Sequence, residues 1–270
     1  MKNILITGGA GYIGAHIVDL LCDSDFNIIV FDNLSSGYQE NLNPKAKFVL
    51  GDITNKKNLE GVFSKYKINS IIHMAAFKSV AESLGTTSKY TENNIIGSLN
   101  LISTAVKFKV EKFIFSSTAA VYGVPQNNSI DETHPLNPIN HYGYTKLYIE
   151  NYLKWISKIE PIKFISFRYF NAAGYSTKQD LINKKEKAPE NLLPIVMEVA
   201  NNTRKDFNIF GNDYDTKDGT CIRDYINVVD LADAHVKALK YLKSKNSLTV
   251  NLSTGVGNSV LDVIKVTEKI

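Results

Sequence analysis

Short apolar runs alternate with helical patterns through the first two thirds of the chain. The runs are rich in Ile, Val and Phe, as is typical of strands buried on both faces. They cover Ile4–Thr7, Asn27–Asp32, Lys47–Asp52, Ser70–Ala76, Lys112–Ala120 and Lys163–Phe170, with a later run at Thr249–Ser253. Apolar residues three and four positions apart predict intervening helices over Tyr12–Asp23, Lys56–Tyr66, Asn94–Phe108 and Tyr142–Ser157. This alternation predicts parallel pairing, and hence an α/β fold with a doubly wound parallel sheet.

The pattern changes in the last third of the chain. Thr177–Glu190 is polar and lysine-rich, and Asn208–Gly219 is crowded with Asn, Asp and Gly, so both are predicted loops. Shorter helices are predicted at Leu192–Thr203, Val229–Lys243 and Ser259–Ile270. We therefore predict a main domain over residues 1–171 and a smaller, loop-rich C-terminal lobe over residues 172–270. Segments such as 225–253 are expected to return to the main domain.

Composition and charge narrow the class of protein. Hydrophobic residues make up 44% and charged residues 21%, which indicates a globular protein rather than a disordered or fibrous one. The sequence shows neither the ~20-residue apolar run of a membrane span nor a signal-peptide core, so we expect a cytoplasmic protein. The net charge of +4 is scattered and predicts no nucleic-acid partner. Cys22 and Cys221 are expected to be buried thiols, and no spacing indicates a metal site.

A glycine-rich turn is the first candidate site. Gly8, Gly11 and Gly14 follow a predicted strand and open a predicted helix. Glycine suits a tight turn, close approach of a pyrophosphate, and packing of the helix on the strand. Asp32 ends the next strand about 20 residues further on, where a carboxylate accepts hydrogen bonds from a ribose 2′-hydroxyl and repels a 2′-phosphate. The combination favours NAD over NADP, and a plain turn is the alternative.

Two later strand ends extend this candidate site. Asp52 and Ile53 close the third strand, where a polar residue could meet the adenine edge or could equally cap the following helix. Ala75 and Ala76 end the fourth strand and offer small side chains where a cofactor could approach, with Lys78 just beyond them.

Tyr142 and Lys146 form the candidate catalytic pair. At positions i and i+4 they share one helix face, where an ammonium beside a phenol would lower the phenol pKa from about 10 toward neutrality. A positively charged nicotinamide would add to that shift. The phenolate could then accept a hydroxyl proton while hydride leaves the adjacent carbon for NAD. Thr118, or less favourably Ser117, lies at a strand end and could bond the same oxygen. An exposed helix face without catalysis is the alternative.

Two longer blocks make the pattern more specific. Phe210–Tyr214 reads Phe-Gly-Asn-Asp-Tyr and Arg223–Ile226 reads Arg-Asp-Tyr-Ile. With the motifs above, they resemble the UDP-galactose 4-epimerase family of the extended short-chain dehydrogenase/reductase superfamily. The resemblance spans essentially all 270 residues. It implies a Rossmann-like fold, bound NAD, a UDP-sugar substrate and a homodimer.

The resemblance also assigns residues by position. It implies NAD contacts from Gly8, Gly11, Tyr12, Ile13, Gly14, Asp32, Asn33, Asp52, Ile53, Lys78, Asn93, Tyr142, Lys146 and Phe170. It implies that the nucleotide sugar contacts Thr118, Asn171, Asn191, Leu192, Phe210 and Arg223. A structural salt bridge of Arg223 with Asp224 or Asp213 is the alternative for that arginine.

The implied reaction is a reversible oxidation at C4 of the sugar, part of galactose and carbohydrate metabolism. A 4-keto sugar forms, turns over, and regains hydride on its opposite face, which interconverts UDP-galactose and UDP-glucose. Related dehydratases carry an acidic pair where this chain has Ala119 and Ala120, so dehydration is disfavoured. Another nucleotide-sugar-modifying member of the superfamily, or an inert NAD-binding sensor or scaffold, remains an alternative. Family members continue for several dozen further residues, which implies that this chain is a truncated form.

Overall fold

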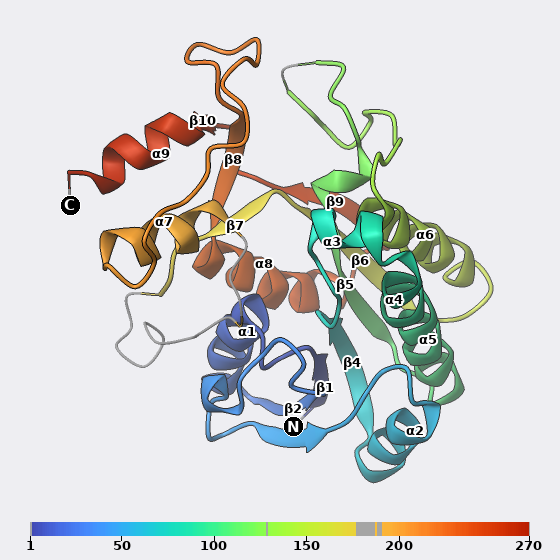
Figure 1. Cartoon of the computed structure of the whole chain (residues 1–270). Coiled ribbons are helices and arrows are strands. Elements are labelled where there is room, and N and C mark those ends of the chain that lie inside the picture. Colours follow the sequence, from blue (N-terminus) through green and yellow to red (C-terminus); the bar gives the residue numbers. More distant parts are fainter. Residues whose placement is uncertain (1, 128, 177–186, 188–190, 270) are drawn as a thin grey trace.

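The computed structural model describes residues 2–127, 129–176, 187 and 191–269 (Figure 1). Most of the predicted loop Thr177–Glu190 lies outside these residues. A seven-stranded parallel sheet has the order β3-β2-β1-β4-β5-β6-β9. Its strands are β1 (Lys2–Thr7), β2 (Phe26–Asp32), β3 (Lys47–Leu50), β4 (Ile68–His73), β5 (Lys112–Thr118), β6 (Lys163–Tyr169) and β9 (Leu248–Leu252). The predicted parallel sheet is confirmed.

Helices cover both faces of this sheet (Figure 1). One face packs against α1 (Tyr12–Cys22) and α8 (Val228–Tyr241), and the other against α2 (Lys56–Lys65), α5 (Ser98–Lys107) and α6 (His141–Ile156). Neighbouring residues of β5 alternate between the two cores: Phe113 and Phe115 face α5 and α6, whereas Ile114 faces α1 and α8. This alternation explains why the strands are apolar throughout their length. The arrangement is the doubly wound, Rossmann-like fold expected from the sequence.

Several predicted elements end earlier than their apolar runs. β4 ends at His73 rather than Ala76, and β5 ends at Thr118 rather than Ala120. The Thr118 side chain accepts the Ala120 N–H at 3.1 Å, which starts a 3₁₀ turn over Ala119–Val121. The apolar residues beyond each strand therefore belong to loops at the carboxyl edge of the sheet. Alanines shortly after each strand lengthen the apolar run in the sequence, although the strand itself has already ended.

The helix predicted over Asn94–Phe108 belongs to a longer and irregular helical run. α4 (Thr87–Tyr90) leads into a π-helical segment over Thr91–Gly97, and α5 follows directly. A shorter helix, α3 (Val80–Gly85), precedes them and was not predicted. π-helical turns are rare and frequently lie at functional sites, and this one carries the predicted cofactor residue Asn93.

A second, three-stranded sheet with the order β10-β8-β7 belongs to the C-terminal region. It consists of β7 (Asn171–Ala173), β8 (Ile222–Asn227) and β10 (Gly257–Ser259), with α7 (Leu192–Ala200) and α9 (Val260–Thr267) beside it (Figure 1). These strands were not predicted, because two of them are only three residues long. β9 and α8 also come late in the chain. β9 nevertheless pairs with β6 of the main sheet, and α8 packs against α1.

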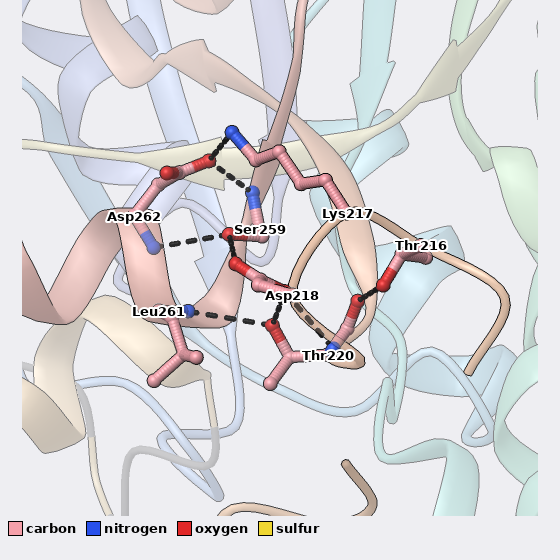
Figure 2. Close-up of polar contacts among 7 residues, drawn as sticks. All are labelled: Thr216, Lys217, Asp218, Thr220, Ser259, Leu261 and Asp262. Atoms are coloured by element: carbon pink, nitrogen blue, oxygen red, sulfur yellow. Dashed lines mark hydrogen bonds and ion pairs between the residues drawn. The ribbon is translucent and has the colours of Figure 1, made fainter. Parts of the chain in front are cut away.

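A polar cluster joins the turn before β8 to the start of α9 (Figure 2). The Ser259 hydroxyl donates to Asp218 at 2.5 Å and accepts the Asp262 N–H at 3.0 Å. Asp262 in turn accepts the Ser259 N–H at 3.1 Å and pairs with Lys217 at 2.8 Å. Ser259 is thus the N-cap of a capping box rather than the first helical residue of the predicted helix. The cluster holds the approach to β8, the strand that carries Arg223.

Two expectations about composition can be compared with the structure. Cys22 and Cys221 are each half-buried rather than buried, so that part of the expectation was wrong. Over the described ranges, no helix has the length and hydropathy needed to cross a membrane.

Candidate active site

Two of the three glycines in the turn between β1 and α1 are required by the surrounding protein. Gly8 adopts φ +73°, and a Cβ there would lie 2.5 Å from the Ala75 nitrogen. A Cβ on Gly14 would lie 2.2 Å from the Gly8 oxygen, so glycine is required for α1 to pack on the turn. At Gly11 a Cβ would meet only the Gly8 oxygen, at an acceptable 3.4 Å. The surrounding protein therefore does not require glycine at position 11, and its absent side chain leaves room for a ligand.

The N-terminus of α1 suits a phosphate group. Gly11 is the N-cap, and among the described residues no side chain caps the first turn and no carboxylate belongs to it. The first N–H groups of a helix lack intrahelical partners and carry a partial positive charge. Together with the space beside Gly11, they form a cradle that fits a pyrophosphate.

A cavity of about 360 Å³ opens at this turn. Ten of the residues predicted to bind the cofactor line it: Gly8, Gly11, Tyr12, Ile13, Gly14, Asp32, Asn33, Ile53, Lys78 and Asn93. The lining does not include Asp52, Phe170, Tyr142 or Lys146. It does include residues that the sequence did not single out, among them Ser35, Ser36, Met74, Glu82, Lys89 and Lys187. Most of these residues belong to loops that come together only in the folded chain, so no local sequence pattern identified them.

Asp32 braces the glycine turn as well as lining the cavity. Its carboxylate accepts the Ala10 N–H at 3.0 Å through one oxygen and the Leu34 N–H at 2.8 Å through the other. Burial raises the pKa of Asp32, and these two bonds partly oppose the rise. Each oxygen still has a lone pair for a further donor. The carboxylate can therefore accept a ribose hydroxyl at the carboxyl end of β2.

Asp52 lies behind Asn33 at the neighbouring strand end. It accepts the Asn33 amide at 2.8 Å and the Thr54 hydroxyl at 2.7 Å. Burial alone would raise the pKa of Asp52, but the bonds from Thr54 and Asn33 lower it below its ordinary value. The N-cap of α2 is Asn55, whose side chain accepts two backbone N–H groups. The alternative interpretation of Asp52 as that cap is therefore wrong.

Asn94, which sequence reasoning did not select, ties the cavity wall to α6. Its side-chain oxygen accepts the Phe77 N–H at 2.9 Å, and its amide donates to the Phe77 carbonyl at 2.9 Å. The amide also lies 3.3 Å from the Thr145 hydroxyl on α6. These bonds fix the loop after β4 against the helix that carries Tyr142. The adjacent Asn93 was the only member of the pair with a predicted role.

Tyr142, Lys146 and Thr118 meet at the carboxyl edge of β5. Lys146 Nζ donates to the Ser116 carbonyl at 2.7 Å and lies 5.9 Å from the centre of the Tyr142 ring. Burial raises the pKa of Tyr142 to about 12, and a hydrogen bond with the Thr118 side chain opposes the rise. Burial also lowers the pKa of Lys146 to about 7. The expected lowering of the phenol pKa is therefore not found, because the ammonium points to Ser116 while the phenol is buried.

Ser117 faces the opposite side of β5 from Thr118. Its hydroxyl donates to Glu150 at 2.5 Å, in the core between β5 and α6. Glu150 forms a two-point ion pair with Arg168, at 3.0 Å and 2.7 Å, and their side chains are 0% and 2% exposed. Because Ser117 is committed to this pair, the structure favours Thr118 over Ser117 as the hydroxyl near Tyr142.

All residues assigned to the nucleotide sugar lie outside the cavity lining, and apart from Thr118 on β5 they belong to the C-terminal region. Asn171 on β7 donates to the Asp224 carbonyl of β8 at 2.9 Å. Arg223 is exposed, and its guanidinium donates to the Ile222 carbonyl at 2.8 Å. The Asp224 carboxylate accepts the N–H groups of residues 254 and 255 instead of pairing with Arg223. Asn191 occupies the N-cap position of α7 without a side-chain capping bond, and Leu192 begins the helix. Phe210 is 84% exposed in the loop before β8.

A doubly wound sheet with this glycine turn and an acidic residue ending β2 defines a dinucleotide-binding α/β protein. A family model described as the NAD dependent epimerase/dehydratase family matches residues 4–253. The chain belongs to this family.

Curated and solved relatives agree with that assignment. The UDP-glucose 4-epimerase of Lacticaseibacillus casei is 42% identical, with 99% of this chain and 81% of that protein covered. A crystal structure of UDP-glucose 4-epimerase from Brucella ovis in complex with NAD has a TM-score of 0.94 and 39% identity, covering 98% and 81%. The Bifidobacterium longum enzyme with NAD+ and UDP has a TM-score of 0.94 and 36% identity, covering 99% and 83%.

The buried ion pair provides a stability prediction. Glu150→Gln leaves the Arg168 guanidinium buried without a counter-charge, so we expect the free energy of unfolding to fall by about 3–5 kcal/mol. Urea denaturation of the variant beside Glu40→Gln, which removes an exposed carboxylate, measures the difference. Equal stability of the two variants would contradict the role given to the pair.

Proposed function

We propose that this chain is an NAD-dependent UDP-glucose 4-epimerase, an isomerase that interconverts UDP-galactose and UDP-glucose through a transient 4-keto sugar. The observation that carries the proposal is the position of Tyr142, Thr118 and Lys146, beside a dinucleotide cavity, in a chain 42% identical to a UDP-glucose 4-epimerase. The cofactor is NAD. The glycine turn and α1 hold its pyrophosphate, and Asp32 accepts hydroxyls of its adenosine ribose.

The residues of the second sheet and α7 bind the nucleotide sugar in this proposal. Arg223 is exposed on β8 and can form charge-assisted hydrogen bonds with a diphosphate. Asn171 and Asn191 offer neutral amides, and Leu192 and Phe210 offer apolar contacts. Residues 1–171 would then hold most of the cofactor and residues 172–270 most of the substrate.

Tyr142 is the proposed acid and base. Its phenolate form takes the proton of the sugar 4-hydroxyl during oxidation, and the resulting phenol returns that proton during reduction. The Thr118 side chain already hydrogen-bonds the Tyr142 phenol, and it therefore orients the phenol oxygen. Its hydroxyl can also donate a hydrogen bond near the sugar 4-hydroxyl. NAD, when bound, supplies a hydride acceptor that returns the hydride, so the reaction has no net redox change. Lys146 provides positive charge near the phenolate that forms, because its Nζ lies 5.9 Å from the ring centre.

Dehydration is disfavoured by the residues after Thr118. Ala119 and Ala120 form the turn there, and neither side chain can protonate a leaving C6 hydroxyl. The chemistry available at this position therefore stops at the 4-keto sugar.

Turnover without added cofactor tests the function. We expect the purified protein to convert UDP-galactose to UDP-glucose with no net change in nicotinamide absorbance, because each hydride is returned. Tyr142→Phe should lower turnover by at least about 100-fold while bound NAD stays near the wild-type amount. Product by NMR and nucleotide content by extraction are measured together. Stoichiometric NADH would indicate an oxidoreductase, and bound NAD without product would indicate an inert sensor or scaffold.

Adjacent hydroxyls on β5 give a matched pair of variants. Thr118→Ala should lower kcat by about 10–100-fold, because it removes the hydroxyl that orients the phenol oxygen. Ser117→Ala should keep kcat within about threefold, since its hydroxyl serves Glu150 and not the reaction. Steady-state kinetics on variants of matched NAD content measures both. A loss of kcat in Ser117→Ala equal to that in Thr118→Ala would overturn the assignment.

A homodimer through α6 is a second part of the proposal, together with a cytoplasmic location. Tyr144, Tyr148 and Trp155 are 51%, 42% and 63% exposed along α6, and their spacing puts them on one side of the helix. Exposed aromatic stripes of this kind mark protein contacts. Tyr148→Glu should shift the mass in sedimentation equilibrium from two chains to one. Tyr241→Glu, on the opposite face of the sheet, should not, and a monomeric wild type would refute the dimer.

A further inference from the structure

Lys187 reaches the cavity from the segment between β7 and α7. Its Nζ donates to the Leu34 carbonyl at 2.7 Å and lies 5.1 Å from the centre of the Tyr38 ring. Its backbone N–H donates to the Ser36 carbonyl at 3.3 Å. Lys187 lines the cavity together with Asp32. A lysine from the C-terminal region is therefore held at the end of the cavity where Asp32 would meet the ribose.

Leu34 shows why this contact is specific. It adopts φ 58°, a left-handed conformation that is unfavourable for a branched side chain and persists only where its surroundings hold it. Asp32 accepts the Leu34 N–H at 2.8 Å, and Lys187 donates to the Leu34 carbonyl. One strained residue is thus held from both sides by a carboxylate and an ammonium. The positive charge of Lys187 also lowers the pKa of Asp32, against the larger effect of burial.

We propose that Lys187 is a cofactor-binding residue that reduces the discrimination of this site against NADP. The proposal rests on the proposed NAD-dependent function. A carboxylate alone at the end of β2 accepts ribose hydroxyls and repels a 2′-phosphate. An ammonium beside it offsets part of that repulsion and can pair with the phosphate, as lysines do. Ser35 and Ser36 line the same part of the cavity and add neutral donors.

The alternative is a purely structural role, in which Lys187 only holds Leu34 in its strained conformation. The two roles can be distinguished by substitution. Attracting a 2′-phosphate needs the positive charge of Lys187, whereas holding Leu34 needs only a hydrogen-bond donor. Lys187→Gln keeps an N–H donor of similar reach and removes the charge. Lys187→Ala removes both. Lys205→Ala removes an exposed lysine outside the cavity lining and is the matched control.

Competition between the two nucleotides tests the proposal. The protein is loaded with the fluorescent analogue etheno-NAD, and the concentrations of NAD and of NADP that displace half of it are measured. We expect Lys187→Ala and Lys187→Gln each to raise the half-displacement concentration of NADP relative to that of NAD by about 10-fold. This is the size expected when one partly screened charge contact is lost. Higher salt should shrink the difference. Lys205→Ala should keep the wild-type ratio.

The opposing outcomes are distinct. An unchanged ratio in both variants, or a loss of both nucleotides in Lys187→Ala that Lys187→Gln restores, would overturn the proposal in favour of the structural role. Wild-type protein that binds etheno-NAD but does not convert UDP-galactose would refute the proposed epimerase while leaving the test of Lys187 intact. Wild-type protein that does not bind etheno-NAD would overturn both.

Discussion

The ion pair between Glu150 and Arg168 fixes the helix on which the proposed chemistry depends. Two carboxylate–guanidinium contacts in a buried core allow little rotation of α6 relative to β6. Tyr142, Lys146 and Glu150 lie at intervals of four along that helix, so they share a face. Holding Glu150 therefore sets the direction in which the other two side chains leave α6. Arg168 also donates to the Tyr122 hydroxyl at 2.9 Å, and that hydroxyl donates to Asn251 of β9. These bonds link the ion pair to β9.

The cofactor side is held by polar contacts of the same kind. Asp32 bonds the backbone at Ala10, within the glycine turn, and Asn94 bonds both polar groups of the Phe77 backbone and approaches α6. The loops that line the cavity are thus fastened to the same sheet and the same helix as Tyr142. A shift of α6 would be transmitted to the wall of the cavity through Asn94. The proposed binding and chemistry therefore share buried polar groups, which are costly to leave partly satisfied.

Local patterns were sufficient for much of the fold and for one side of the site. The central strands and the glycine turn depend on residues close in sequence, so apolar runs and the spacing of Gly8, Gly11 and Gly14 predicted them. Lys187 had no such signal, because its partners Leu34 and Tyr38 lie more than a hundred residues away and belong to another element. The choice between Ser117 and Thr118 was equally beyond local reasoning. It depends on which face of β5 meets Glu150, and that follows from register.

The phenol pKa shows how far residue identity alone can mislead. Placing Lys146 one turn after Tyr142 predicted a lowered pKa, yet burial raises the pKa of Tyr142 to about 12 and lowers that of Lys146 to about 7. Both shifts favour the neutral forms, since an isolated charge is poorly solvated in this core. A phenolate and an ammonium formed together would attract each other and so offset part of this cost. Positive charge beside Tyr142 would therefore favour the phenolate, the form that can accept a proton, which couples the base to an occupied site.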